Sequence, residues 1–496
     1  MTSKKEKITA VVVLLIALLI DLSYAYWKAN YEQKEDNIVN SSCFNIKYIN
    51  EKNDINLEKA YPITDEEASS LTPYEFEIQN NCDKDAMYDV NVEILNTSTL
   101  DSKYVKVKLN DNVSLLSDKE EMTPVLKDTS KGYKIITGVV KAKSTNKYSL
   151  NIWMDYDTPP TSDTMNKIFE IKVSITSAYK KVTAVDYVTA LGTSDSTNLA
   201  IDDYGNTRYI GANPNNYVSI DGELWRIIGV MKDIDDGTGI KEDRIKLIRN
   251  ESIGNYSWDT SASDVNDGRG VNEWSQADLM KLLNPGYENE EVGGSLYWNN
   301  QIGTCYYARN NGTTSCNFQN TGIKEGLKSI INGVVWNSGA SSYNKTANDI
   351  YIEERGVKNG KICTSGDYCN DNIIRTTTWT GKVGLMYPSD YGYATSGGSN
   401  TNRSTCLNTS LGNWSSFTDC YTNNWLYKSD KFNWLLTAFV NIEKSCVGLY
   451  IDRLGKISTP ETSRGDAFVY PTVYLKSSVK IVSGDGTSDN AFVLTE

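Results

Sequence analysis

The sequence predicts a mainly β chain: an N-terminal helix, then an antiparallel β-sandwich, then an α+β domain rich in loops. Three observations predict this order. An unbroken apolar run covers residues 10–20, six segments before residue 178 alternate apolar and polar side chains, and further helical patterns appear only beyond them. A period of two places apolar side chains on one face of a strand, whereas a helix needs spacings of three and four. The predicted parts are residues 1–27, 40–178, a linker at 179–203, and 204–496.

The first 27 residues have the order of an export signal. A lysine-rich start precedes the apolar run, and the small residues Ser23 and Ala25 close the segment, which predicts a signal peptide cleaved after Ala25. Extended to Trp27, the segment approaches the roughly 20 residues of a membrane-spanning helix, with Asp21 near its outer end. The segment can therefore be interpreted either as a cleaved signal peptide or as a retained membrane anchor. Either one places the bulk of the chain outside the cell, at the cell membrane or cell surface.

Composition supports export and argues against some partners. The 496 residues include nine cysteines, which are typical of proteins that mature in an oxidising space. The net charge of -13 does not favour binding to the negatively charged backbone of a nucleic acid, so we expect no nucleic-acid partner. The chain contains no histidine, which removes the commonest general base and metal ligand.

The six alternating segments are the predicted strands of the sandwich. Each segment is bounded by Asn, Asp, Ser or Pro clusters, and an antiparallel sandwich buries one face of each sheet. Cys43 and Cys82 are the only cysteines in this half, and a bridge between them would close a loop of about 40 residues, worth roughly 3 to 4 kcal/mol. The segments are residues 44–48, 74–78, 88–94, 104–109, 148–153 and 168–175.

Residues 1–178 resemble the camelysin and biofilm-fibre family of Gram-positive bacteria. The resemblance is carried by Ala-Tyr-Trp at 25–27 directly after the export segment, the Phe-x-Ile strand at 44–46, and the closing segments 150–157 and 169–173. It implies a jelly-roll sandwich on the cell surface that assembles, in some members, by donating a strand to a neighbouring subunit. Some members are described as metallopeptidases, but a His-Glu-x-x-His zinc site is impossible in a chain without histidine.

Beyond the sandwich, residues 182–191 could form one amphipathic helix, and the Ser-, Thr- and Asp-rich stretch 192–198 is interpreted as a spacer. In the last domain, short apolar runs predict core strands, and Ser275 is expected to cap a helix that Asn284-Pro-Gly ends. A second helix is expected at 323–331. The expected strands are 224–230, 245–249, 470–475 and 479–482, and a turn at 484–487 leads to a closing hairpin strand at 491–494.

The second half resembles a domain of unknown function that recurs in surface proteins of anaerobic gut Firmicutes and mollicutes. The segments that carry this resemblance are 208–218, 223–230, 246–254, 379–392 and 473–479. The order of its pieces is also similar to C-type-lectin-like and sulfatase-modifying-factor folds. This second likeness is an analogy of fold and implies no activity.

Seven cysteines fall in this half, and their spacing suggests three local disulfides. Cys446 is left over in an apolar, strand-like run. As a nucleophile it would need a base, and without histidine a buried, inert thiol is the expectation. The suggested pairs are Cys305 with Cys316, Cys363 with Cys369, and Cys406 with Cys420.

Two Asp-rich segments, starting at Asp233 and Asp264, look at first like calcium loops. An EF-hand needs an oxygen ligand at its fifth position and glycine at its sixth, whereas both segments place glycine fifth, at Gly237 and Gly268. They are therefore predicted to be turns. No cofactor or metal is predicted, although Ca²⁺ held by oxygens from separate loops stays open.

Loop aromatics are the candidate binding residues, because rings stack on sugar faces while neighbouring Asn and Asp bind hydroxyls. Core packing is the alternative for each of them, and Trp225 and Trp434 are expected in the core because they lie in apolar strands. The candidates are Trp258, Trp274, Trp298, Trp379, Tyr391 and Trp414.

Two functions follow from these patterns. The first is a non-enzymatic adhesion or structural protein, anchored at the cell surface by its N-terminal segment, whose sandwich stalk holds a glycan- or protein-binding head. The second is a cell-envelope enzyme, either a hydrolase or a degenerate relative of the formylglycine-generating fold. Acidic pairs such as Glu353–Glu354, or Asp367 with Asp371, would suit a glycosidase only if the fold placed them about 5 to 10 Å apart. We expect them to be ordinary solvated carboxylates.

Overall fold

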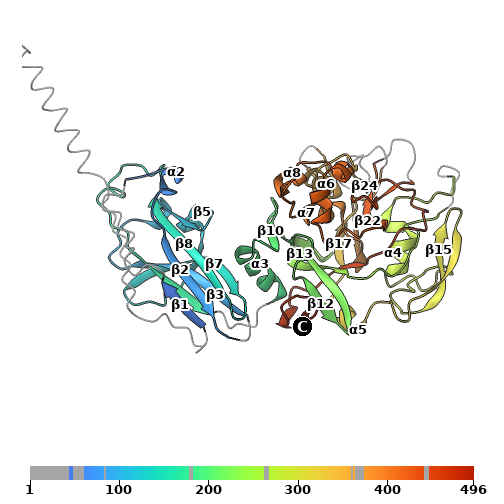
Figure 1. Ribbon diagram of the computed structural model, residues 1–496, viewed down its shortest axis with the longest axis horizontal. Coiled ribbons are helices and arrows are strands. Elements are labelled where there is room, and N and C mark those ends of the chain that lie inside the picture. Colours follow the sequence, from blue (N-terminus) through green and yellow to red (C-terminus); the bar gives the residue numbers. More distant parts are fainter. Residues whose placement is uncertain are drawn as a thin grey trace, which may run out of the picture. The chain divides into compact units, whose positions relative to one another are not determined.

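The computed structural model describes residues 44–48, 61–82, 85–177, 183–261, 267–358, 361–362, 374–440 and 446–496. Strands hold 38% of the residues and helices 16%, which confirms the mainly β fold class. The chain divides into two compact units, residues 1–180 and 181–496 (Figure 1). The predicted signal or anchor at 1–27, with its cleavage site at Ala25, lies outside the described residues. Among the helices within the described ranges, none combines the length and apolar character needed to cross a bilayer.

The first unit contains two antiparallel sheets that share one hydrophobic core. Phe76, Ile78 and Ile152 of one sheet and Val90 and Val173 of the other belong to the same buried cluster, so this unit is a β-sandwich. The five-stranded sheet has the order β1 (Phe44–Tyr48), β2 (Tyr74–Asn80), β8 (Thr145–Met154), β4 (Val105–Leu109), β5 (Asn112–Leu115). The four-stranded sheet has the order β6 (Glu120–Met122), β7 (Thr129–Val140), β3 (Ala86–Leu95), β9 (Ile171–Ser177). Short helical turns are α2 (Asp65–Ala68), η1 (Ser102–Tyr104) and η2 (Leu116–Asp118).

All six predicted strands are present, and three further strands, β5, β6 and β7, were not predicted. The longest of them is β7. Its pairing with β3 shifts register between Val90 and Asn91 and again between Ile94 and Leu95. Each shift inserts a residue and turns the following side chains to the other face, so the period of two breaks along the strand.

The second unit is built on a nine-stranded sheet. Its order is β21 (Val383–Gly384), β25 (Thr472–Tyr474), β14 (Lys241–Arg249), β13 (Glu223–Asp235), β12 (Tyr217–Ile220), β27 (Phe492–Thr495), β26 (Lys480–Ser483); β11 (Thr207–Tyr209) pairs with β13 and with β10 (Leu199–Ile201). The β12–β27 pairing is parallel and the other pairings are antiparallel. The β26–β27 hairpin confirms the predicted C-terminal hairpin.

Four small antiparallel sheets and short helices complete this unit. The sheets pair β15 (Ile302–Ala308) with β16 (Gly312–Asn317), β17 (Val334–Asn337) with β20 (Thr378–Gly381), β18 (Val357–Lys358) with β19 (Lys361–Ile362), and β22 (Asn433–Ala438) with β23 (Gly448–Ile451) and β24 (Ile457–Ser458). The helices are α3 (Ala184–Ser194), α4 (Asp278–Leu283), α5 (Glu325–Ile330), α6 (Ala347–Glu354), α7 (Pro388–Tyr393), α8 (Arg403–Leu407), α9 (Thr418–Thr422), η3 (Trp274–Gln276) and η4 (Leu411–Ser416).

The predicted linker at 179–203 is wrong from residue 183 onward, because this stretch is part of the second unit. Thr183 caps α3 in a capping box with Asp186, and α3 packs against strands of the large sheet and buries Val188 and Leu191. A Cβ on Gly192 would lie 2.6 Å from a Thr207 methyl group. Gly192, the first residue of the stretch interpreted as a spacer, therefore lies within α3 and allows the helix to pack close to β11.

Both helices predicted in the last domain exist but are shorter than expected. The first is interrupted: η3 precedes α4, and the N-cap of α4 is Ala277, which has no side-chain cap. Ser275 is therefore not the cap, since its hydroxyl donates to Glu273. The second helix is α5.

Candidate functional site

Most of the aromatic candidates lie in the core instead of on a binding surface. Trp258, Tyr391 and Trp414 have no exposed area and Trp274 retains 2%. A ring face that solvent cannot reach cannot stack on a ligand, so the binding role predicted for these four residues is wrong and each is a packing residue. Trp298 is buried too, at 9% exposed, while Trp379 is half-buried beside the ring of Trp274.

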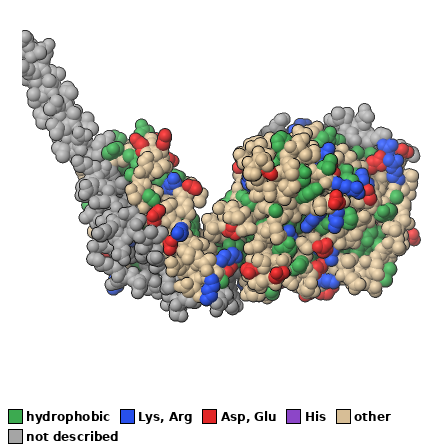
Figure 2. All heavy atoms as spheres, viewed as in Figure 1, with side chains coloured by type: hydrophobic (Ala, Val, Ile, Leu, Met, Phe, Trp, Pro, Cys, Tyr) green, Lys and Arg blue, Asp and Glu red, His purple; other side chains and the backbone are tan. Residues whose placement is uncertain are grey.

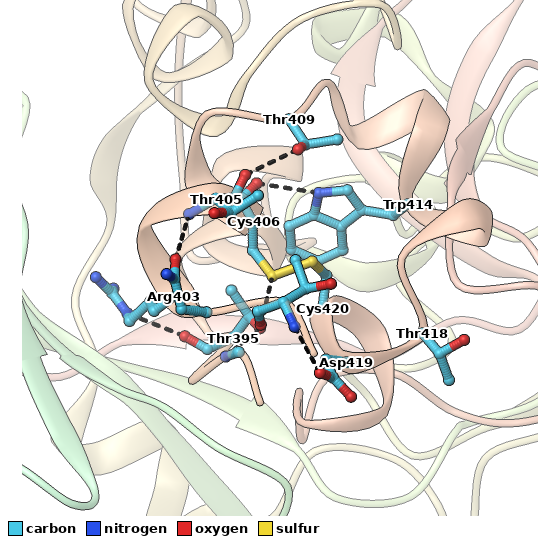
Figure 3. The surroundings of a disulfide bond; sticks show 12 residues. Thr395, Arg403, Thr405, Cys406, Thr409, Trp414, Thr418, Asp419 and Cys420 are labelled. Carbon is cyan, nitrogen blue, oxygen red and sulfur yellow. Dashed lines mark hydrogen bonds between the residues drawn. A yellow bond between two sulfur atoms is a disulfide. The ribbon is translucent and has the colours of Figure 1, made fainter. Parts of the chain in front are cut away.

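Figure 3 shows why Trp414 is buried. Its indole lies against the Cys406–Cys420 disulfide, which joins α8 to α9, and its Nε1 donates to the Cys406 carbonyl at 3.3 Å. The second disulfide in the described part of the chain, Cys305–Cys316, joins β15 to β16. Both pairs match the spacing-based prediction.

Of the remaining five cysteines, only Cys82 and Cys446 lie within the described residues. Cys82 is disulfide-bonded, and Cys43, its predicted partner, lies outside the described residues, as do Cys363 and Cys369. Cys446 is buried, in agreement with the expected position of its thiol.

The first Asp-rich segment is the predicted turn, between β13 and β14. Asp235 Oδ1 accepts the backbone N–H groups of Gly237 and Gly239 at 2.8 and 3.2 Å, and Asp236 Oδ1 accepts that of Thr238 at 2.8 Å. These carboxylates are therefore used to close the turn. In the second segment, residues 264–266 lie outside the described residues.

An open groove of about 480 Å³ lies between the loop that follows α4 and the strand β15. The loop is held by Ser295, whose Oγ donates to the Asn284 carbonyl and accepts the Tyr287 N–H. Gly293 N–H donates to the Thr304 carbonyl of β15 at 2.8 Å. The groove is thus fixed at both ends. It is lined by Gly286, Tyr287, Asn289, Glu290, Glu291, Val292 and Tyr306.

The groove combines two ring faces with hydrogen-bonding groups. Tyr287 and Tyr306 are half-buried, whereas Asn289, Glu290 and Glu291 are exposed. Burial, with the charges of Asp278 and Glu290, raises the pKa of Tyr306, so this phenol stays neutral and able to donate. Figure 2 shows that basic and acidic side chains are interspersed over the visible face of the second unit. This face has no large patch of a single charge, so a ligand would be selected by individual hydrogen bonds and ring contacts.

Neither groove tyrosine was a predicted site residue. The available signal was a run of turn-forming and acidic residues at 284–291, which directly follows a helix and contains Tyr287. The pairing of Tyr287 with Tyr306 depends on the contact between the loop and β15, which no local pattern indicates.

A network of buried charges lies elsewhere in this unit and was also missed. Asp390 of α7 accepts from Arg208 Nη1 of β11 and from Lys246 Nζ of β14, both at 2.6 Å, and Arg208 Nε also pairs with Asp202 at 2.8 Å. Each of these side chains is 2% exposed or less. The signal in the sequence was a charged residue inside an apolar segment, because a charged side chain that becomes buried needs a counter-charge or a hydrogen-bond partner.

In this network, burial shifts each pKa toward the neutral form of the side chain, whereas pairing with an opposite charge shifts it toward the charged form. Burial lowers the pKa of Lys246 to about 8, although Asp390 opposes the shift. Burial alone would raise the pKa of Asp390, but the charges of Lys246 and Arg208 outweigh it and hold the pKa below its usual value. The rings of Tyr387, Trp336 and Tyr474 surround the ammonium, with the Tyr387 centroid at 3.9 Å. We interpret this enclosed, fully paired network as structural.

The acidic pair Glu353–Glu354 does not converge on one site. Glu353 accepts from Ser341 Oγ and pairs with Lys345, whereas Glu354 is buried and accepts the N–H and hydroxyl of Ser389. The expectation of a solvated carboxylate is therefore wrong for Glu354. Asp367 and Asp371 lie outside the described residues.

Glu354 should make the stability of the second unit pH-dependent. Burial raises its pKa to about 7 from 4.5, against the opposing effects of Arg355 and Ser389. Between these two values the folded protein holds a proton that the unfolded chain has released, so this contribution is complete below pH 4.5 and is lost as the pH rises to about 7. Denaturant titration should give a free energy of unfolding about 2 kcal/mol higher at pH 5 than at pH 7.

The Glu354→Gln variant is the control for this pH dependence. It keeps an acceptor and a donor for Ser389 but has no proton to lose, so most of the difference between pH 5 and pH 7 should vanish. A smaller part should remain from Asp278, whose pKa burial and the Asp259 charge raise to about 6. An unchanged difference in the variant would contradict the assignment to Glu354.

Comparison of the chain with protein-family models, with curated proteins and with solved structures found no match. Function is therefore inferred from the chain's own residues, and the groove between Tyr287 and Tyr306 is the candidate site.

Proposed function

We propose that this chain is an exported adhesion or structural protein of the cell surface, and that its second unit binds glycans through the groove. The groove carries the proposal. Its two tyrosine rings can stack on the C–H face of a sugar, while the Asn289 amide and the carboxylates of Glu290 and Glu291 face its hydroxyls. A volume of about 480 Å³ lies within the range of small-ligand sites.

Binding is favoured over catalysis by the state of the carboxylates. Glu290, in the groove, is exposed and paired with Lys281 at 3.0 Å. Among the described residues, the acids whose pKa is raised are Asp259, Asp278 and Glu354. None of them lines the groove, and they accept hydrogen bonds from Val271, Thr260 and Ser389, respectively. A glycan that is cleaved while bound, detected by mass spectrometry, would instead support the envelope enzyme.

Export and surface display are part of the same proposal. The disulfides of the described residues support maturation in an oxidising space. For the first unit we propose a jelly-roll arrangement, supported by its two antiparallel sheets around one core. For the second we propose a C-type-lectin-like arrangement, supported by the disulfides that join its short helices α8 and α9 and its strands β15 and β16. Attachment through residues 1–27, a protein ligand for the head, and self-assembly by strand donation stay predictions.

Replacing Tyr306 with alanine should weaken binding to a glycan identified on an array by about fivefold, because the stacked ring supplies about 1 kcal/mol. Isothermal titration of the full chain measures the change. Tyr307→Ala is the matched control, because this neighbouring tyrosine is 39% exposed and does not line the groove. Equal losses in both variants, or none in either, would remove the groove as the binding site.

A further inference from the structure

Arg226 and Lys428 face a narrow cleft at one side of the large sheet, away from the residues of the groove. Arg226 projects from β13, whereas Lys428 follows a segment held by Trp425, whose Nε1 donates to the Tyr209 carbonyl at 2.9 Å. The main polar and aromatic residues of the cleft are Arg226, Arg249, Asn250, Trp425, Lys428 and Tyr470.

Arg226 is a buried cation that has only neutral partners. It is 4% exposed, and its guanidinium lies over the rings of Tyr217 and Trp425, with centroids at 4.1 and 4.5 Å. Nε donates to Asn216 Oδ1 at 2.8 Å, and Nη2 donates to Asn213 Oδ1 and the Pro214 carbonyl. Within the described part of the chain no carboxylate pairs with Arg226, and its Nη1 has no acceptor.

Lys428 adds a second cation that forms no ion pair with a described residue. Its side chain is half-buried, its Nζ lies 6.0 Å from the Tyr470 ring centroid, and no described residue accepts a hydrogen bond from it. Burial and the charge of Arg226 lower its pKa to about 8; Glu251 opposes this shift and Lys431 adds to it. The third cation of the cleft, Arg249, is neutralised by Glu223.

This arrangement differs from that of three other buried cations in the unit. Arg208, Lys246 and Arg249 each contact a carboxylate. A buried charge without a counter-charge is costly, and Arg226 together with the half-buried Lys428 creates a site where an anion replaces the missing partner. The rings of Trp425 and Tyr470, which line the cleft, exclude water and so strengthen the attraction between the cations and an anion.

We propose that this cleft binds a carboxylate group, which Arg226 Nη1 and Lys428 Nζ hold between the Trp425 and Tyr470 rings. The carboxylate would come from an acidic sugar or from a small organic acid. The space in the cleft, about 10 Å³, accommodates about one water, so one oxygen of the carboxylate can enter it, and a planar group places less bulk at the entrance than a tetrahedral anion does. The proposal does not depend on the groove, since the two sites share no residue.

The test is isothermal titration calorimetry of the full chain at pH 6.5 and low salt. Glucuronate, acetate, sulfate and glucose are titrated separately, and the affinity of each is measured. Saturable binding of a carboxylate, at least tenfold tighter than that of glucose or sulfate, is expected. Tighter binding of glucuronate than of acetate identifies an acidic sugar, and equal binding identifies a small acid. Affinity should fall as the pH passes about 8, where Lys428 loses its proton.

The variants make the proposal falsifiable. Lys428→Gln should weaken carboxylate binding at least tenfold, and Lys428→Arg, which keeps the charge, should stay within about threefold. Lys431→Gln removes the same charge three residues away, outside the cleft, and should change affinity by less than about twofold. No carboxylate binding, or equal losses in Lys428→Gln and Lys431→Gln, would overturn the proposal. Circular dichroism confirms that each variant is folded.

Discussion

Replacing Asp390 with asparagine is expected to lower the free energy of unfolding of the second unit by about 3 to 5 kcal/mol. Asp390 is the shared acceptor of Arg208 and Lys246, and its removal leaves the Lys246 ammonium buried without a counter-charge. Its Oδ2 also accepts the Tyr387 N–H at 2.9 Å at the start of α7. Denaturant titration followed by tryptophan fluorescence reports mainly on this unit, because it contains most of the tryptophans.

The control for this prediction is Asp466→Asn. Asp466 pairs with Arg464, but its side chain is 50% exposed, and an ion pair in water contributes less than about 1 kcal/mol. The two variants remove the same charge, so their difference isolates the effect of burial. Similar losses in both would contradict the interpretation of the network as a structural device of the core.

The second large effect is expected in the first unit, at Glu93 of β3. Its side chain is fully buried and accepts the N–H groups of Val125 and Leu126 and the hydroxyls of Thr129 and Ser174. Glu93→Ala removes the acceptor of the Val125 and Leu126 N–H groups and of the Ser174 hydroxyl, while Thr129 can still donate to the Leu126 carbonyl. Each buried donor left unpaired costs about 1 to 3 kcal/mol. We expect a total loss of about 3 kcal/mol or more, measured by far-UV circular dichroism in denaturant.

Glu93→Gln separates hydrogen bonding from charge. The amide retains one acceptor oxygen but places an NH₂ group opposite backbone donors, so its loss should fall between zero and that of the alanine variant. The segment 123–129 should also become more sensitive to protease in Glu93→Ala, because Glu93 holds its backbone. Protease resistance equal to that of the native chain would contradict this role.

The sandwich strands could be predicted because each has one buried and one exposed face. In β2 buried and half-buried residues alternate from Tyr74 to Asn80, which is the pattern that a period of two detects. The strand β7 has no such alternation, since two bulges in its pairing with β3 interrupt it. Local pattern therefore located the regular strands and missed the irregular one.

The sites could not be predicted in the same way, because long-range contacts create them. The bonds from Asp390 reach 182 residues to Arg208 and 144 residues to Lys246. Aromatic composition also misled the prediction of binding residues: Trp258 and Trp414 occur in loop-like sequence, but the loops fold inward and their indoles donate to backbone carbonyls. Whether a ring faces solvent depends on tertiary packing, which spacing does not encode.

Glycan binding by the full chain tests the proposed function most directly. On a glycan array that includes mucin-type structures, the native chain should bind a defined subset, and the Tyr287→Ala/Tyr306→Ala double variant should lose that binding while Tyr307→Ala retains it. No binding by the native chain to any glycan or mucin, or binding that survives in the double variant, would contradict the proposal that this groove is a glycan site.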